Sequence, residues 1–280
     1  MLPEGTIDLI ERTLREDIGS GDHTTLSTIP AGAHGGARLL VKDNGVLAGI
    51  ELAEAIIKHF DPALEPRIFL QDGAAIQKGD IAFTLAGPKR SILTVERTIL
   101  NFMQRMSGIA TLTRKFVNAV EGTGCKVLDT RKTTPTLRAM EKWAVRIGGG
   151  HNHRHGLFDM IMIKDNHVDM AGGIAQAIGA AREYLERKGI RIPIEVETRG
   201  LDEVSQVLAC GGIDRIMLDN FKPTMSVQAV QMIAGRYETE ASGGIDLSNV
   251  REHAETGVDY VSVGLLTHGA PSLDLSLKAL

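Results

Sequence analysis

The spacing of hydrophobic residues changes character near residue 110 of the chain. Before that point, apolar positions recur at helical spacing over residues 4–16 and 51–60, which predicts two helices. Residues 36–50 and 67–87 instead predict short strands joined by tight turns. Because Asn-Gly favours left-handed backbone conformations, Asn44-Gly45 predicts a hairpin within the first of these stretches.

Residues 92–106 form a longer amphipathic segment. Its apolar side chains fall on one stripe at helical spacing, at Ile92, Val95, Ile99, Met103 and Met106. The pattern therefore predicts a helix whose apolar face packs in a hydrophobic core rather than against a cofactor.

Beyond residue 126, strand-like and helix-like segments alternate. Apolar runs occupy residues 126–131, 160–164, 192–198, 214–219, 237–242 and 258–264, and helix-like segments occupy 136–147, 173–187, 201–209, 224–234 and 247–255. The runs begin 21 to 34 residues apart. Regular alternation at this spacing predicts parallel βα units, which we expect to form a barrel with fewer than eight strands.

Each strand-like run ends in polar or glycine residues. In parallel barrels the carboxyl ends of the strands meet on one rim, where the active site lies. We therefore expect a single binding cup lined by Thr130, Arg131, Lys132, Lys164, Asp165, Glu197, Asp219, Asn220, Ser242, Gly243, Gly244, Val263, Gly264 and Leu265. The glycines of the last two runs allow the close backbone approach that phosphate binding requires.

Composition and charge narrow the range of ligands that the chain could bind. The chain has 280 residues, of which 43% are hydrophobic and 24% charged, as in an ordinary globular protein. A net charge of −4 and an aromatic content of 4% disfavour binding to nucleic acids or membrane surfaces. Residues 126–164 nevertheless contain eight Lys or Arg and three acidic residues, a local charge of +5. This local excess predicts a small, heavily anionic ligand.

Three alternating histidines, His151, His153 and His155, leave two interpretations open. An HxH pair can bind a metal, as in barrel hydrolases. However, these histidines follow three glycines rather than an apolar strand, and Arg154 would repel a cation. The alternative is an anion-binding loop in which His153 and Arg154 donate hydrogen bonds.

Lys132 and Lys164 also allow two interpretations. A Schiff-base lysine, as in an aldolase, needs a lowered pKa, which apolar burial would supply. Two lysines crowded with arginines indicate instead an anion clamp. The chain contains neither a P-loop nor a dinucleotide-binding GxGxxG segment, so the usual nucleotide cofactors are unsupported.

The cysteines and the N-terminal residues indicate the cellular compartment in which we expect the protein. Cys125 and Cys210 are the two cysteines and form no CxxC pair, which favours a reducing compartment over a disulfide or zinc framework. The first 20 residues carry seven charged side chains, unlike a signal peptide. No apolar run approaches the roughly 18 residues that a membrane span needs. We expect a cytoplasmic protein.

The stretch LDTRKTTPTLRAMEKWAVRIGGGHNHRHGLFDMIMIKDNH, residues 128–167, resembles the quinolinate phosphoribosyltransferase family. The resemblance extends almost from end to end, through EDIGSGDHTT (16–25), ERTILNFMQRMSGIATLT (96–113), IEVET (194–198), IMLDN (216–220), EASGGI (240–245) and VSVGLLTH (261–268). Thr136 stands where the family usually has glycine, and Leu265, Gly269 and His23 also depart from its pattern.

The resemblance implies an N-terminal α/β sandwich domain over residues 1–110, with the tail 268–280 packed against it, and an incomplete α/β barrel of about seven parallel strands over 111–267. It implies a type II phosphoribosyltransferase of NAD biosynthesis, which makes nicotinate mononucleotide, pyrophosphate and CO2 from quinolinate and phosphoribosyl pyrophosphate. The resemblance implies a need for Mg²⁺ and a homodimer, or a hexamer, in which the partner's sandwich domain closes each active site.

The resemblance also assigns roles to residues. Arg97 reaches into the partner's site, and the anion-binding positions are Arg131, Lys132, His153, Arg154 and Lys164. Lys132, Lys164, Glu197 and Asp219 are the expected catalytic residues, and the two carboxylates face, indirectly, a Mg²⁺ carried with phosphoribosyl pyrophosphate. Thr130 also lines the substrate site. The 5′-phosphate turns are Ser242, Gly243 and Gly244, and Val263, Gly264 and Leu265.

Charge arithmetic agrees with this assignment, because roughly seven negative charges on the two substrates face five cationic side chains and Mg²⁺. Four alternative functions remain open. Two are transferases of the same fold, a nicotinate phosphoribosyltransferase and the molybdenum-associated paralogue of the family. The others are a metal-dependent hydrolase that uses His151 and His153, and a non-enzymatic anion-binding regulator. The second cationic cluster favours a dicarboxylate over nicotinate.

Overall fold

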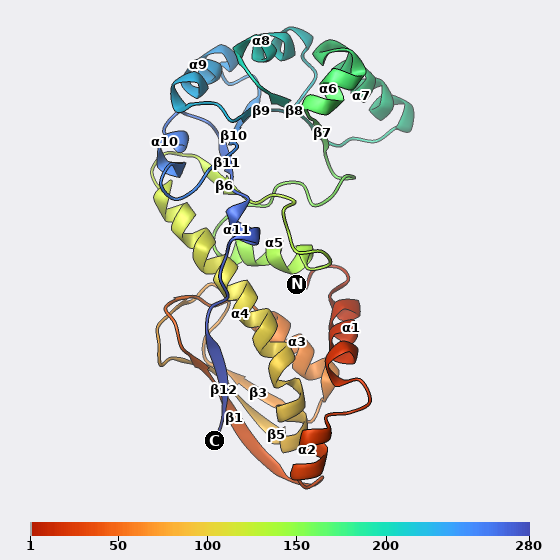
Figure 1. Ribbon diagram of the computed structural model, residues 1–280, viewed down its shortest axis with the longest axis vertical. Helices are drawn as coiled ribbons and strands as arrows, with labels where there is room; N and C mark the ends of the chain where they lie inside the picture. The colour runs from red at the N-terminus through yellow and green to blue at the C-terminus, as the bar shows by residue number, and fades with distance from the viewer. Residues whose placement is uncertain (1) are drawn as a thin grey trace. The chain divides into compact units, whose positions relative to one another are not determined.

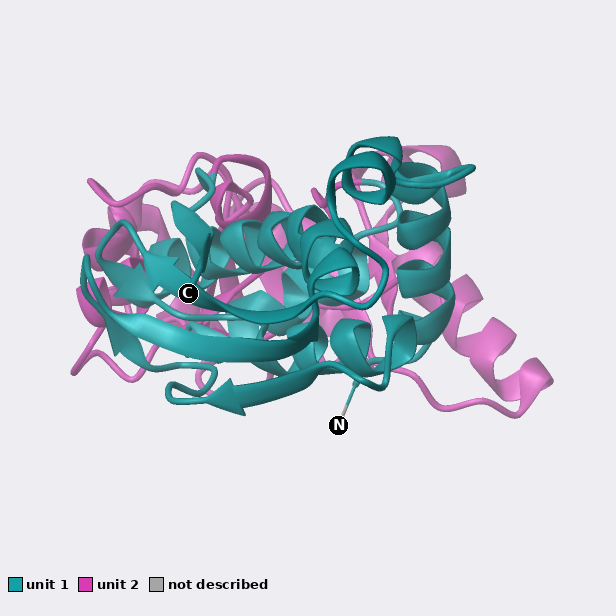
Figure 2. Cartoon of the chain, turned by 90° about the horizontal axis from the view of Figure 1, so that it is seen from below, with its two compact units in different colours: residues 1–114, 135–149, 270–280 teal, residues 115–134, 150–269 magenta. Residues whose placement is uncertain are grey.

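The structure is a computed structural model and describes residues 2–280. It divides into two compact units (Figure 2). The first comprises residues up to Arg114, Pro135–Gly149 and Ala270–Leu280, and the second comprises Lys115–Thr134 and Gly150–Gly269. The expected division placed residues 1–110 and the tail 268–280 in one domain and residues 111–267 in the other. The first unit also takes in Pro135–Gly149, which that division had assigned to the barrel.

The first unit is built on a four-stranded antiparallel sheet in the order β12-β1-β5-β3. Its strands are β1 (His34–Val41), β3 (Glu65–Ile68), β5 (Ile81–Pro88) and β12 (Leu275–Ala279). Its helices are α1 (Thr6–Ile18), α2 (His23–Thr28), α3 (Ile50–Phe60), α5 (Arg138–Ile147) and most of α4 (Lys89–Ala119). The helices predicted at 4–16 and 51–60 are confirmed, and the C-terminal residues supply an edge strand beside β1 (Figure 1).

The predicted hairpin at Asn44-Gly45 is wrong. β1 pairs with β5 and β12, whereas β2 (Gly45–Val46) pairs with β4 (Ala75–Ile76) in a separate small sheet. Gly45 does not adopt a positive φ. A Cβ on Gly45 would lie 2.4 Å from Thr111 Oγ1 of α4. The glycine is therefore needed for a close approach to that helix, not for a turn.

The stripe predicted along residues 92–106 is confirmed as the buried face of α4. Ile92, Val95, Ile99, Met103 and Met106 are all at most 5% exposed. Within the first unit, Arg105 of α4 donates to Glu141 Oε1 of α5 from Nη2 at 2.8 Å, and the Glu141 side chain is almost fully buried. This ion pair ties α5 to the first unit.

The second unit carries six parallel strands in the order β6-β11-β10-β9-β8-β7. They are β6 (Lys126–Leu128), β7 (Ile161–Ile163), β8 (Ile194–Thr198), β9 (Arg215–Asp219), β10 (Glu238–Ser242) and β11 (Tyr260–Ser262). An isolated parallel bridge joins Leu128 to His151 beyond β6. The sheet does not close between β6 and β7, so the incomplete barrel is confirmed with six strands and one bridge.

Helices that connect these strands lie along the outer side of the sheet (Figure 1). They are α6 (Asp165–Ala171), α7 (Ile174–Lys188), α8 (Leu201–Cys210), α9 (Pro223–Ile233) and α10 (Val250–Ala254). The helix α11 (Leu265–His268) follows β11, the last strand of this sheet. The short helices α6 and α11, which follow β7 and β11, were not predicted. Right-handed βα connections place every strand's carboxyl end on one rim of the unit.

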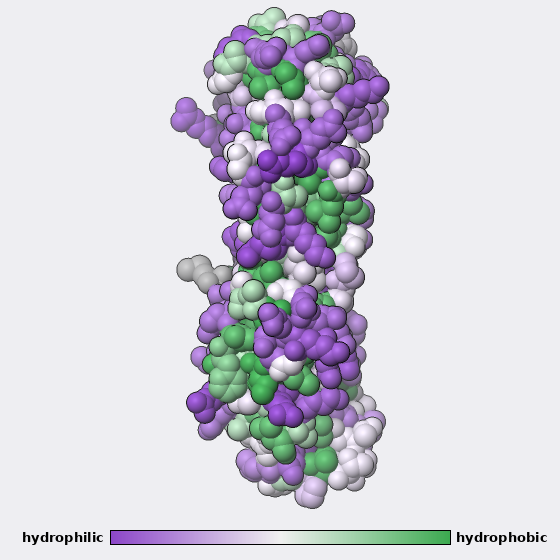
Figure 3. All heavy atoms as spheres, turned by 90° about the vertical axis from the view of Figure 1, so that its left-hand side faces the viewer, coloured by the Kyte–Doolittle hydropathy of each residue, from purple (hydrophilic) through white to green (hydrophobic). Residues whose placement is uncertain are grey.

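Apolar side chains are concentrated inside each unit. Leu39 and Phe83, paired across β1 and β5, are fully buried, as is Phe116 in the second unit. On the face drawn in Figure 3, hydrophobic residues form small groups separated by hydrophilic ones. No helix within residues 2–280 combines the length and hydropathy needed to cross a membrane.

Candidate active site

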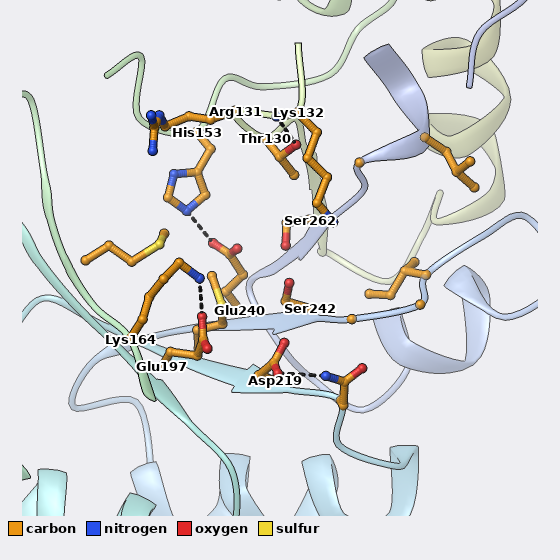
Figure 4. Close-up of a pocket in the computed structure, with 18 of the residues that line it drawn as sticks. Thr130, Arg131, Lys132, His153, Lys164, Glu197, Asp219, Glu240, Ser242 and Ser262 are labelled. Atoms are coloured by element: carbon orange, nitrogen blue, oxygen red, sulfur yellow. Dashed lines mark hydrogen bonds and ion pairs between the residues drawn. The ribbon is translucent and has the colours of Figure 1, made fainter. Parts of the chain in front are cut away.

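The carboxyl ends of the parallel strands surround a pocket of about 870 Å³ in the second unit (Figure 4). This volume lies within the range of about 300–1,000 Å³ that is typical of small-molecule sites. The structure brings the following predicted residues to its lining: Thr130, Arg131, Lys132, His153, Arg154, Lys164, Glu197, Asp219, Asn220, Ser242, Gly243, Gly244, Gly264 and Leu265.

Three residues expected at the site, Arg97, Asp165 and Val263, do not line this pocket. Val263 is fully buried, and its main-chain N–H donates to the Leu128 carbonyl at 2.9 Å, so it is not available to a phosphate. Arg97 is exposed on α4 in the first unit. Its expected role in a partner's site stays a prediction.

The cationic side of the pocket is formed by loops that follow β6 and His151. Arg131 and Lys132 follow β6, and Arg154 lies three residues after His151. Burial and the positive charge of Arg131 lower the pKa of Arg154. Two guanidinium groups that repel each other in one pocket form a site for anions, although the charges of Glu195 and Asp159 partly offset that of Arg154.

Lys164 and Glu197 point toward each other across the strand ends (Figure 4). Lys164 Nζ forms an ion pair with Glu197 Oε2. The Glu197 side chain is almost buried, whereas that of Lys164 is 44% exposed. The lysine is thus placed at the pocket surface by a carboxylate from the neighbouring strand.

The turn after β10 explains why glycine is needed there. Gly243 has φ 95°, and a Cβ on it would lie 2.2 Å from Asn220 Oδ1 and 2.9 Å from the Asn220 main-chain nitrogen. Gly244 has φ 61° and open space at its Cβ position. Asn220, itself left-handed, donates its main-chain N–H to the Ser242 carbonyl at 2.8 Å. The two strand ends therefore interlock, leaving the glycine backbone open to a ligand.

Several pocket residues were missed by reading only strand ends. These are Met162, Met217, Glu240, Ile245, Asp246, Ser262 and His268. Side chains two apart on a strand share a face. Counting back two positions from Lys164, Asp219, Ser242 and Gly264 leads to Met162, Met217, Glu240 and Ser262. That period-two signal was present in the sequence.

Below the pocket lies a buried charge cluster of His153, Glu195, Arg215 and Glu240. His153 Nε2 lies 2.9 Å from Glu195 Oε2 and 3.3 Å from Glu240 Oε2. Arg215 Nη1 lies 2.9 Å from Glu240 Oε2. Both glutamates are completely buried, and the His153 side chain is 3% exposed.

These contacts shift the ionisation of the buried charge cluster. Burial opposes a charged imidazole, but the hydrogen bonds and charges of Glu195 and Glu240 outweigh it and raise the pKa of His153 to about 9. Burial and the negative charge of Glu240 raise the pKa of Glu195 to about 7. The cluster as a whole therefore retains a proton at neutral pH, and its apparent pKa values belong to the group rather than to one residue.

Two groups of carboxylate side chains in the second unit are candidate ligands for a metal ion. Within residues 2–280, His153, Glu195 and Glu240 are the one group of three ligands close enough to hold an ion. Arg215 already supplies a positive charge to Glu240, so this group does not fit a cation. His151 and His155 are exposed and do not belong to this group of ligands, so the geometry does not support a metal-dependent hydrolase that uses an HxH pair.

Glu197 and Asp219 form the second set, and both line the pocket at the ends of neighbouring strands. Asp219 Oδ2 accepts a hydrogen bond from Asn220 Nδ2 at 2.7 Å, which orients the carboxylate. Mg²⁺ prefers oxygen donors and commonly keeps several waters while binding one or two carboxylates and substrate phosphates. The donor set at these strand ends fits that mode of binding.

Comparison with known proteins points to one family. The chain matches the models described as quinolinate phosphoribosyl transferase, N-terminal domain, over residues 22–107, and C-terminal domain, over residues 109–278. It is 46% identical to nicotinate-nucleotide pyrophosphorylase (carboxylating), chloroplastic, of Arabidopsis thaliana, over 96% of this chain and 81% of that protein. It is 40% identical to the probable nicotinate-nucleotide pyrophosphorylase (carboxylating) of Bacillus subtilis, over 96% and 91%.

A solved structure agrees with these sequence matches. The crystal structure of NadC from Streptococcus pyogenes superposes with a TM-score of 0.94 at 40% identity. The alignment covers 100% of this chain and 99% of that one. The similarity therefore includes both compact units.

Proposed function

Since the chain belongs to the quinolinate phosphoribosyltransferase family, we propose that it transfers the phosphoribosyl group of phosphoribosyl pyrophosphate to quinolinate. The products are nicotinate mononucleotide, pyrophosphate and CO2, a step of NAD biosynthesis. The observation that carries this function is one pocket lined by four cationic side chains, two carboxylates and glycine-rich turns. That layout suits two anionic substrates bound side by side.

The cationic side suits quinolinate. Arg131 and Arg154 are positioned to bind the two carboxylates, and guanidinium groups bind carboxylates in a bidentate way. Held there, the pyridine nitrogen faces the ribose C1. Fixing two reactants in a reactive geometry lowers the barrier by about 7–11 kcal/mol. Lys132 and Lys164 offset the negative charge that develops on the departing pyrophosphate.

The opposite side suits the phosphoribosyl group. The main-chain N–H groups of Gly243 and Gly244 approach the 5′-phosphate, with Gly264 and Leu265 beside them. The ribose becomes cationic in the transition state, and Glu197 and Asp219 stabilise that charge through the ribose hydroxyls. We assign Mg²⁺ as the cofactor, held through Asp219 and Glu197 by way of its waters; it would neutralise the pyrophosphate as it leaves.

Decarboxylation follows from the transfer itself. Once the ring nitrogen is bonded to ribose C1 it carries a positive charge. When the C–C bond to the adjacent carboxylate breaks, its electron pair remains on the ring carbon next to that nitrogen and is later protonated. The positively charged ring nitrogen stabilises this electron pair. The residues of the pocket therefore need only hold the substrate.

The assembly and location belong to the same proposal. We propose a homodimer, or a hexamer, in which exposed Arg97 of one subunit completes the site of another. We also propose a cytoplasmic enzyme. Both cysteines are free thiols, as in a reducing compartment. The relatives include one named chloroplastic, so a plastid location is the alternative.

The first experiment follows both products together. Purified protein is mixed with Mg²⁺, phosphoribosyl pyrophosphate and quinolinate, with nicotinate in a parallel reaction, and CO2 and nicotinate mononucleotide are quantified. We expect equal amounts of both products from quinolinate and none from nicotinate. Turnover of nicotinate alone would reassign the cationic side of the pocket, and no turnover of either would overturn the proposed function.

Variants then test the cationic side. Arg131→Ala and Lys132→Ala should each lower kcat/KM, since losing a charge partner in a desolvated site costs about 2–5 kcal/mol. Lys126→Ala is the matched control. Lys126 begins β6, the strand that Arg131 and Lys132 follow, and it does not line the pocket. Near wild-type activity of both pocket variants would contradict the clamp.

A further inference from the structure

The main chain of Lys164 receives support from the sheet on one side only. β7 ends at Ile163 and lies at the edge of the parallel sheet, where it pairs with β8. α6 begins at Asp165, so Lys164 is the single residue between the strand and the helix. The hydrogen bonds that fix its main chain must therefore come from the helix that follows.

His167, in the first turn of α6, bonds to this main chain twice. The main-chain N–H of Lys164 donates to His167 Nδ1 at 2.9 Å. In return, the main-chain N–H of His167 donates to the Lys164 carbonyl at 2.9 Å. Such a reciprocal pair is a capping box, in which the third residue of a helix accepts from the residue that caps its start. His167 does not line the pocket, so these bonds reach the site only through Lys164.

The side chain of Lys164 is held at its far end as well. Its Nζ forms an ion pair with Glu197 Oε2, and both side chains line the pocket (Figure 4). His167 therefore fixes the main chain of this lysine, whereas Glu197 fixes its ammonium group.

Few other contacts hold α6 in place. Val168 is the one residue of this helix that is buried. Asp169 forms an ion pair with Arg199 at 3.3 Å, but both side chains are exposed. Because exposed ion pairs contribute little, the path of the chain from β7 into α6 depends on the capping box.

We propose that His167 is a positioning residue for the transfer reaction, whose Nδ1 holds the Lys164 main chain so that the Lys164 ammonium stays directed at the diphosphate of the substrate. The inference rests on the proposed function, which assigns Lys164 to the departing pyrophosphate. His167 acts through Lys164 and does not touch the substrate. A side chain that presents an acceptor at this place should therefore replace the imidazole, and one without an acceptor should not.

The experiment compares His167→Gln with His167→Met in the full-length enzyme. The two new side chains match in length and in helix propensity, but only Gln carries an acceptor that can complete a capping box. Because His167 is exposed, both variants should fold.

We expect kcat to fall about 10- to 100-fold in His167→Met, the range for removing a group that orients a functional side chain. In His167→Gln, kcat should stay within about threefold of wild type, because the capping box is kept. KM for each substrate should change less than about threefold in both variants, since Lys164 acts on charge that develops in the transition state.

Hydrogen exchange tests the contact without turnover. The amide proton of Lys164, followed by NMR, should exchange slowly in wild type and in His167→Gln but rapidly in His167→Met. Wild-type exchange or a wild-type kcat in His167→Met, whatever its Tm, would overturn the inference. An equal loss of kcat in both variants would also overturn it, because the acceptor would then not matter. A wild-type enzyme that is inactive with quinolinate would count against the proposed function, whereas the exchange rates would still decide whether His167 holds Lys164.

Discussion

The turn after β10 allows a prediction whose size follows from the structure. In Gly243→Ala, the new Cβ would lie 2.2 Å from Asn220 Oδ1 and 2.9 Å from the Asn220 nitrogen, whereas ordinary contacts begin at 3.4 Å. Asn220 would have to retreat by about 1 Å, and its hydrogen bonds to Ser242 and Asp219 would lengthen. The variant therefore displaces both the turn that we propose to bind phosphate and the carboxylate of Asp219.

Two other glycines provide controls of matched backbone strain. Gly235 and Gly244 have φ of 71° and 61°, and nothing lies within 4 Å of a Cβ placed on either. Alanine in this region costs about 1–2 kcal/mol, and Tm falls about 2–4 °C for each kcal/mol in a protein of this size. Gly235→Ala lies outside the pocket, so it should lower Tm by this amount with unchanged kinetics.

Gly243→Ala should lower Tm further, because overpacking adds about 1–3 kcal/mol. Its KM for phosphoribosyl pyrophosphate should rise at least about tenfold, equivalent to 1.4 kcal/mol. Initial rates at varied concentrations of each substrate, with differential scanning fluorimetry, measure both effects. If Gly243→Ala matched Gly235→Ala in Tm and kept a wild-type KM, the assignment of this turn to the phosphate would be refuted.

The remaining predictions concern the assembly, the metal and single side chains. Mixing inactive Arg97→Ala with inactive Lys164→Ala should restore activity after subunit exchange, because mixed dimers hold one intact site; no rescue would place Arg97 outside the partner's site. Chelation should abolish turnover but leave Tm of the substrate-free enzyme unchanged, since Mg²⁺ arrives with phosphoribosyl pyrophosphate; a fall in Tm would indicate a resident ion. Burial raises the pKa of the Cys125 thiol to about 12, so at pH 8 it stays neutral and iodoacetamide should label Cys210 much faster, as peptide mass mapping would show. Thr136→Gly should raise Tm, because Thr136 has φ 69° and glycine removes left-handed strain of about 1–2 kcal/mol; an unchanged or lower Tm would show that the strain is already compensated.

The local pattern of the sequence predicted much of the fold. Apolar runs that alternate with helix-like segments identified the six parallel strands, and helical spacing identified the buried stripe of α4, because both patterns depend on which side chains face the core. Polar residues at strand ends predicted the pocket, since parallel strands present their carboxyl ends on one rim. The motifs around residues 128–167 predicted the family.

Tertiary structure decided the features that depend on distant partners. Gly45 is needed because Thr111 of α4 approaches it, and no local signal distinguishes that from a turn. β1 pairs with the C-terminal strand β12, more than 230 residues away in the chain, which displaced the expected hairpin. The buried charge cluster was missed because Glu195, Arg215 and Glu240 lie on separate strands. Only the parallel register brings their charges close enough, in a dry interior, to hold His153 in place.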